Sequence, residues 1–225
     1  MSIQADPEPT PTQTQMQTTT EPPTRAAVPA DRATTKGDRT RSSLLAAGVI
    51  RFAREGFRGT SVADICRDAG LSTTASYPYY ANKEALFVAA VDEDVAGLID
   101  DAISFVDMRE DSGHWARRMM QGLLSRLVDH PLAGRILRGL EPDFTMRLLH
   151  IPALEELRKT VTALIRTEQI EGSVRRDIDP DQTANGMVVI VISLLMAATQ
   201  TGAMGIEQVV GDVESVLQAV TRPPE

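Results

Sequence analysis

The 225-residue chain has a single cysteine and few aromatic residues, which make up 4% of it. One cysteine cannot form an internal disulfide, and a reducing, intracellular setting is the default for such a chain. The shortage of aromatics disfavours an all-β interior, where aromatic and β-branched residues are enriched. Hydrophobic residues still make up 42% of the chain, enough for a real core. We therefore expect a helical interior rich in Ala, Leu and Val.

Signatures of common enzymes are also missing. The sequence has no G-x-S-x-G, P-loop, H-E-x-x-H or C-x-x-C pattern. His114, His130 and His150 have no metal-ligand spacing. The apolar run from Met187 to Ala198, which Ser193 interrupts, is much shorter than the ~20 residues that span a membrane. The sequence therefore predicts no enzyme, no cofactor, no metal and no membrane partner, with a cytoplasmic location.

Charge is unevenly distributed along the chain, whose formal net charge is −8. Eight basic and four acidic residues between Lys36 and Lys83 give +4, so the remainder carries −12. Phosphate binding needs a local positive surface rather than a basic average, although a solvated charged face would give the same count. Residues 1–35 lack the apolar run of a signal peptide and can bury little apolar surface. We expect them to be a disordered tail.

After the tail, apolar residues recur at helical spacing and predict about nine helices. The first ends at Gly56, and Ser61 with Asp64 is a capping-box pattern that starts the second. Asn82 is expected to cap a long helix that ends near residue 108. Asp179 and Pro180 form another start signal. The other helices are expected over residues 72–77, 113–129, 132–139, 153–170, 180–200 and 206–220.

Two short helices separated by Gly70-Leu71-Ser72 have the layout of a helix-turn-helix, which places its second helix in a DNA major groove. The hydroxyls of Ser72, Thr73 and Thr74 would lie at the start of that second helix, where they can bond base edges or phosphates. All three tyrosines, Tyr77, Tyr79 and Tyr80, follow at once. A phenol can donate to phosphate while its ring packs on sugar.

Residues 44–87 resemble the tetracycline-repressor-like (TetR) family of bacterial regulators. The matching motifs include Thr60-Ser61-Val62-x-Asp64-Ile65, Ala69-Gly70-Leu71-Ser72 and Asn82-Lys83-Glu84. The resemblance implies an all-α fold, with a three-helix DNA-binding domain over residues 36–84 and a helical effector-binding and dimerisation domain over residues 85–222. It assigns Tyr80 and Cys66 to the core. It implies DNA contacts by Thr60, Ser61, Ser72, Thr73, Thr74, Tyr77, Tyr79 and Lys83.

Three residues depart from the family pattern. Thr74 stands where glycine is usual, Ser76 replaces an aliphatic residue, and Pro78 removes a backbone N–H. These departures leave the operator sequence open. They also support an alternative, a helical ligand-binding or scaffold protein that no longer reads DNA. A helical enzyme that uses an apolar pocket is a third hypothesis.

The C-terminal helices of this family form a ligand pocket and a dimer interface. In this chain residues 187–198 are apolar on nearly every face, and Val209, Val213, Val216 and Val220 share one side of the last helix. An ordinary core helix is the alternative to an interface. The sequence thus predicts a homodimeric regulator of transcription that reads a palindromic operator, a repressor released by a small apolar effector. Candidate pocket residues, each of which could equally be core, are Phe105, Trp115, Met119, Phe144 and Met146.

Overall fold

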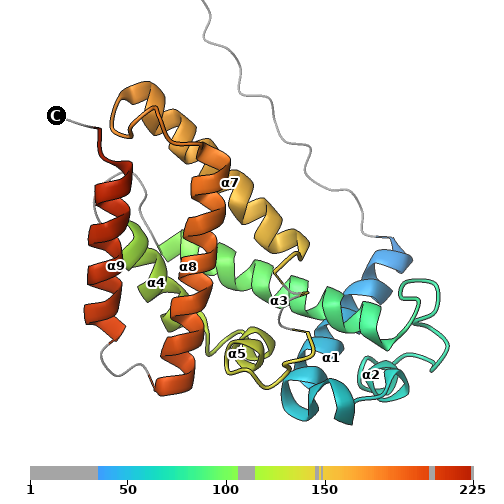
Figure 1. Ribbon diagram of the computed structural model, residues 1–225. Helices are drawn as coiled ribbons and strands as arrows, with labels where there is room; N and C mark the ends of the chain where they lie inside the picture. The colour runs from blue at the N-terminus through green and yellow to red at the C-terminus, as the bar shows by residue number, and fades with distance from the viewer. Residues whose placement is uncertain (1–34, 106–114, 145–146, 148, 203–205, 224–225) are drawn as a thin grey trace, which may run out of the picture. The chain divides into compact units, whose positions relative to one another are not determined.

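Eight α-helices and no strand form the part of the chain that the computed structural model describes, which is residues 35–105, 115–144, 147, 149–202 and 206–223. The expected all-α fold is confirmed, whereas the predicted tail lies outside the described residues except for Thr35, which caps α1. Figure 1 shows α1 and α2 beside the start of α3, with α7, α8 and α9 toward the other end of α3. The helices are α1 (Lys36–Gly59), α2 (Val62–Asp68), α3 (Lys83–Phe105), α4 (Trp115–Arg126), α5 (Pro131–Leu137), α7 (Pro152–Glu171), α8 (Pro180–Thr201) and α9 (Ile206–Thr221).

The three predicted caps all begin helices. The Ser61 hydroxyl accepts the Asp64 N–H at 3.1 Å at the start of α2. Asn82 Oδ1 accepts the Ala85 N–H at 2.8 Å before α3, and Asp179 Oδ1 accepts the Gln182 N–H at 2.9 Å before α8. Each cap satisfies one of the backbone donors that a helix leaves unpaired in its first turn.

The expected third helix over residues 72–77 is not an α-helix. Residues 73–79 form consecutive turns, in which Ala75 N–H donates to Ser72 O and Tyr79 N–H donates to Ser76 O, both at 3.0 Å. Pro78 explains part of the difference, because it cannot donate to Thr74 and disfavours helical backbone at the residue before it. The serines and threonines before Tyr77 add little helix propensity to so short a segment.

An interlocked set of aromatic rings forms the core between the first helices and α5. The Phe87 ring lies 5.0 Å from Phe52, 5.2 Å from Phe57 and 4.7 Å from Phe144, centroid to centroid. Phe52 and Phe87 are fully buried. A separate cluster, mainly aliphatic, includes Leu98 and lies farther along α3. Because α3 contributes to both clusters, it crosses the predicted domain boundary without a break, and residues 35–225 form one compact unit.

Helix α8, which is apolar on nearly every face, buries only one of its faces among the described residues. Met187, Val188 and Leu195 face inward, whereas Val189 is 48% exposed. By length and composition alone α8 could cross a membrane, a criterion that helices of packed proteins also meet. Only 28% of its most apolar window is buried within the subunit. The helix therefore presents an apolar face that the described residues do not cover.

Candidate nucleic-acid interface

The reading segment, residues 72–79, presents polar side chains at the surface. Ser72, Thr73 and Thr74 are exposed, and 71% of the Tyr77 surface is accessible. Gly70 has a φ of 68°, a conformation that glycine adopts without steric cost, and it lets the chain turn sharply out of α2. The Ser72 and Thr74 hydroxyl oxygens lie 3.4 Å apart. These hydroxyls form a compact set of donors and acceptors that can face DNA.

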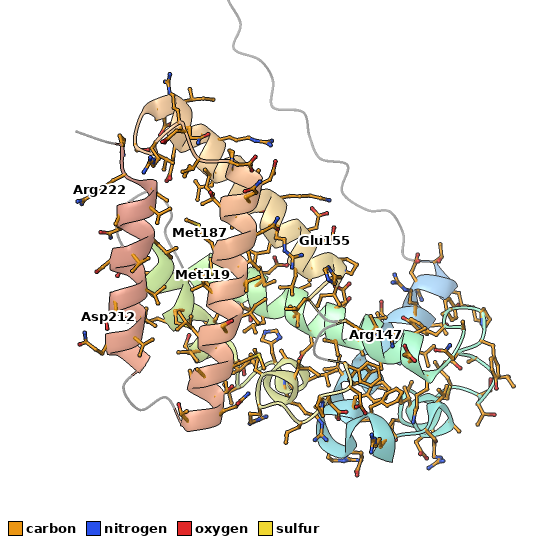
Figure 2. The ribbon with its side chains drawn as sticks, in the orientation of Figure 1. Met119, Arg147, Glu155, Met187, Asp212 and Arg222 are labelled. Carbon is orange, nitrogen blue, oxygen red and sulfur yellow. The ribbon has the colours of Figure 1, made fainter. Side chains whose placement is uncertain are left out.

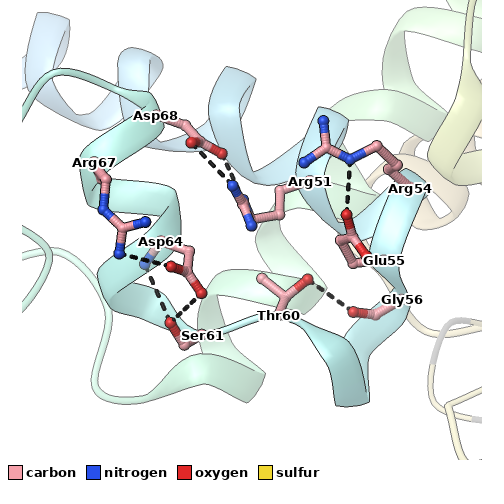
Figure 3. A network of polar contacts seen from close by, with 9 residues as sticks. All are labelled: Arg51, Arg54, Glu55, Gly56, Thr60, Ser61, Asp64, Arg67 and Asp68. Carbon is pink, nitrogen blue, oxygen red and sulfur yellow. Dashed lines mark hydrogen bonds and ion pairs between the residues drawn. The ribbon is translucent and has the colours of Figure 1, made fainter.

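Helix α2 is fixed to α1 by an ion pair between Arg51 and Asp68. The Arg51 guanidinium donates from Nε and Nη2 to the two carboxylate oxygens of Asp68 at 2.5 and 3.0 Å (Figure 3). This hydrogen bonding holds the pKa of the Asp68 carboxyl below its usual value. The neighbouring Arg67 donates to Asp64, which is also bonded to Ser61. Such planar, bidentate pairs fix orientation as well as distance.

Two of the predicted phosphate contacts have side chains that are engaged inside the protein. Thr60 is 3% exposed, and its hydroxyl donates to Gly56 O at 2.8 Å. The Lys83 ammonium donates to Phe57 O and Thr60 O, both at 3.0 Å, and lies 4.4 Å from the centre of the Phe57 ring. Ser61 and the hydroxyls of residues 72–74 are thus exposed, whereas the Thr60 hydroxyl is buried and the half-buried Lys83 ammonium is bonded to backbone carbonyls.

The remaining tyrosines differ in burial. Tyr79 is half-buried, and its hydroxyl lies next to Gly37 at the start of α1. Tyr80 is buried as expected, and its hydroxyl has no hydrogen-bond partner among the described residues. Burial raises the pKa of the Tyr80 phenol, and nearby Arg41 partly opposes this shift. Cys66 is fully buried, also as expected.

A joint between α1 and the segment after α5 was not predicted from the sequence. The Phe57 N–H donates to Glu141 Oε1 at 3.0 Å, and Arg135 Nε donates to the same oxygen at 2.8 Å. Gly56 makes room for this pair, because a Cβ there would collide with Arg135 Nη2 and Glu141 Oε1. Its φ of 75° breaks the helical geometry within α1 and exposes the Phe57 N–H. Phe57 and Glu141 are too distant in sequence to leave a local signal.

An apolar cavity lies between α3, α5, α7 and α8. It has a volume of about 100 Å³, and all its lining side chains are apolar, among them Val95, Ile136, Leu157 and Ile192. The five predicted pocket residues do not account for it. Phe144 belongs to the aromatic core, and Met119, labelled in Figure 2, belongs to the cluster that includes Leu98 and Leu123. Met146 and the side chains of Phe105 and Trp115 lie outside the described part of the chain.

The fold and this surface define an all-helical regulator with an N-terminal helix-turn-helix that binds DNA. Residues 44–90 match the model of the family described as bacterial regulatory proteins, tetR family. The transcriptional repressor AcnR of Corynebacterium jeikeium is 24% identical over 180 residues, 75% of this chain and 86% of AcnR. The repressor KstR2 of Rhodococcus jostii is 27% identical over 158 residues, 67% of this chain and 75% of KstR2. Residues 44–90 thus match the DNA-binding region of the TetR family, and the two proteins similar to most of this chain are transcriptional repressors.

Solved structures confirm the fold. A TetR-family regulator from Pectobacterium atrosepticum superposes with a TM-score of 0.65 at 21% identity, covering 85% of this chain and all of the other. The fatty acid degradation regulator FadR from Bacillus halodurans gives 0.60 at 15% identity, covering 80% and 94%. At these identities the likeness concerns the fold and not the ligand.

Proposed function

We propose that the protein is a homodimeric repressor of transcription whose hold on a palindromic operator is released by a small apolar effector. The observation that carries this proposal is the apolar cavity, because two of the helices that line it, α3 and α5, also contact the DNA-binding region. Helix α3 lines the cavity with Val95 and begins at the helix-turn-helix. Helix α5 lines it with Ile136 and bonds the end of α1 through Arg135 and Glu141.

The cavity lining favours one class of effector. An uncharged hydrocarbon-like molecule fits, because a polar group placed there would lose its hydrogen bonds to water without replacement. Cavities of comparable size with such walls stay dry and take up benzene-sized molecules. A ligand that binds more tightly when the walls have moved would shift the protein away from the DNA-binding arrangement. Effector binding by residues 85–222 and DNA binding by residues 36–84 would thus be coupled through one conformational equilibrium.

The exposed face of α8 and α9 supports the dimer. Val189 on α8 and Val209, Val216 and Val220 on α9 are 45% to 61% exposed. An apolar surface of this kind marks an interaction site when it is contiguous. Two such helices from each subunit would make a four-helix interface with twofold symmetry, which suits a palindromic site.

The DNA contacts that we propose come from the surface residues of the helix-turn-helix. Ser61 and Tyr79 would bond phosphates, whereas Thr73, Thr74 and Tyr77 would reach base edges or the adjacent backbone. Ser72 lies at the start of the same segment. We leave out the Thr60 hydroxyl, because it is buried against Gly56 O.

Selection of bound duplexes from a random pool tests the DNA-binding part and gives the half-site spacing. We expect a palindrome, with binding to it weakened by small apolar compounds such as benzene. Thr73→Ala should change the preferred sequence, whereas Tyr79→Phe should weaken binding to all sequences alike. Failure to enrich any sequence at ~50 mM salt, where phosphate contacts are strongest, would favour the scaffold alternative. Hydrolysis or turnover of the compounds would favour an enzyme.

Sedimentation of matched variants tests the dimer. Val216→Glu places a charge on the proposed interface and should yield monomers. Val128→Glu introduces the same charge at a residue that is 81% exposed and follows α4, so it should leave the dimer intact. Equal behaviour of the two variants would contradict the assignment of α8 and α9.

A further inference from the structure

We infer that Lys83 is a positioning residue that braces the helix-turn-helix from within, and not a contact to DNA phosphate. The inference rests on the bonding of its ammonium group. Two hydrogen bonds of 3.0 Å run from Nζ to Phe57 O and Thr60 O. The third side of the group is 4.4 Å from the centroid of the Phe57 ring. An ammonium has three donors, and two of them are already used by carbonyls inside the protein.

The two carbonyls are a suitable place for a cation. Helix α1 ends at Gly59, and Thr60 is its C-cap, so Phe57 O and Thr60 O belong to the last turn and its cap. Carbonyls in the last turn of a helix lack intrahelical partners and carry partial negative charge. The aromatic face of Phe57 adds a second electrostatic attraction. If the ammonium moved to a phosphate, these two carbonyls would lose their hydrogen bonds to it.

Through this contact, Lys83 joins the three elements that form the DNA-binding surface. Its backbone is the first residue of α3, its ammonium holds the end of α1, and Thr60 directly precedes the cap of α2. Phe57 is consequently bonded on both sides of its backbone, with its N–H donating to Glu141 and its C=O accepting from Lys83. The brace therefore sets the orientation of α2 and the reading segment relative to α3.

A brace and a phosphate contact respond differently to salt. A lost phosphate contact weakens binding to every sequence and lowers the salt slope of log K by about one. A lost brace leaves the number of phosphate contacts unchanged, so the slope stays the same. It misplaces the reading segment, which weakens operator binding more than binding to random DNA. The ratio of specific to random affinity therefore separates the two roles.

The experiment uses the three lysines of the chain, Lys36, Lys83 and Lys159. Each is changed to Met in the full-length protein, which removes the ammonium and keeps an unbranched stem. Affinity for the selected operator and for a random duplex is measured by fluorescence anisotropy from 50 to 300 mM salt, with all three changes compared at matched conditions. Lys159 lies on α7 and is paired with Glu156, so Lys159→Met controls for a general change in charge. Lys36→Met does so at the exposed start of α1.

We expect Lys83→Met to lower operator affinity by about tenfold while the salt slope and the random-duplex affinity stay at wild-type values. A slope reduced by about one, with both duplexes weakened alike, would overturn the inference, as would unchanged binding. If Lys83→Met fails to fold, Lys83→Arg decides, because a guanidinium serves a phosphate well but cannot occupy a compact ammonium site. Wild-type affinity in that variant would speak for a phosphate contact. A wild-type protein that binds no operator would instead refute DNA binding itself.

Discussion

The two hydrophobic regions along α3 are built differently. Near the DNA-binding end, the Phe87 ring contacts those of Phe52, Phe57 and Phe144, and we expect this aromatic region to be filled. Farther along the same helix, Val95 and Leu98 face a cavity of about 100 Å³. A filled core holds one geometry, since interiors pack as densely as organic crystals. A core that contains a cavity can bind a small ligand. In the proposed function, the filled end is the fixed one and the end with the cavity is the one that responds to the effector.

The largest effect that we expect comes from emptying the filled region. Phe87 is fully buried and contacts three other rings. Phe87→Ala should lower the free energy of unfolding by about 3–5 kcal/mol. Urea denaturation followed by circular dichroism measures the change. A loss below about 1 kcal/mol would mean that the aromatic region is not tightly packed.

Enlarging side chains should distinguish the two regions more sharply. Ala90 is fully buried against α1, and Ala90→Val should cost about 1–3 kcal/mol through overpacking. Val188 lines the cavity, so Val188→Ile can place its added methyl group in free space and should change stability by less than about 1 kcal/mol. Equal losses in urea denaturation would erase the distinction between a filled and a partly open core.

A smaller gain is expected at the edge of the filled region. The buried Tyr80 hydroxyl has no hydrogen-bond partner among the described residues. Tyr80→Phe removes this unsatisfied group and should raise the free energy of unfolding by about 1 kcal/mol. The control is Tyr77→Phe, whose phenol is exposed and should have no effect on unfolding. A loss of stability in Tyr80→Phe would reveal a partner for the hydroxyl.

The smallest effect concerns pH and the surface of the helix-turn-helix. Arg51 lowers the pKa of Asp68, so this carboxylate favours the folded state above the ordinary Asp pKa of about 3.9. The stabilisation is lost as pH falls through the lowered folded-state value. Asp68→Asn should therefore be slightly less stable than wild type at pH 7, and the gap in thermal midpoint should narrow toward pH 4 and below. A gap that stays constant with pH would contradict this ion pair.

Local sequence signals predicted most of the fold. The caps at Ser61, Asn82 and Asp179 were found because a cap acts within three residues. The prediction of a helix around Tyr77 is wrong. The helix-turn-helix pattern predicts it, but Pro78 disfavours a helix at the end of so short a segment.

The candidate site was harder to predict, because it depends on contacts between distant segments. Glu141 reaches Phe57 from another element, and no pattern near either residue indicates it. The cavity is lined by Val, Leu and Ile at ordinary core spacing. Hydrophobic periodicity predicts which face of a helix is buried. It does not predict whether side chains of the neighbouring helices leave a cavity beside that face. Bulky residues such as Phe144 are therefore the ones that the sequence predicts for a pocket, although Phe144 does not line this cavity.

The conformation of Gly56 predicts how alleles with a substitution at this position would behave. Any other residue there would meet Arg135 and Glu141 and would hold an unfavourable backbone conformation. The substitution would disrupt the hydrogen bond between Phe57 and Glu141, which are distant in sequence from the exposed valines of α8 and α9. In the proposed dimer, a subunit altered at Gly56 would still pair with a normal one and present a misaligned reading segment. Such an allele should be dominant in a cell that carries both copies, because mixed dimers would engage only half of the operator.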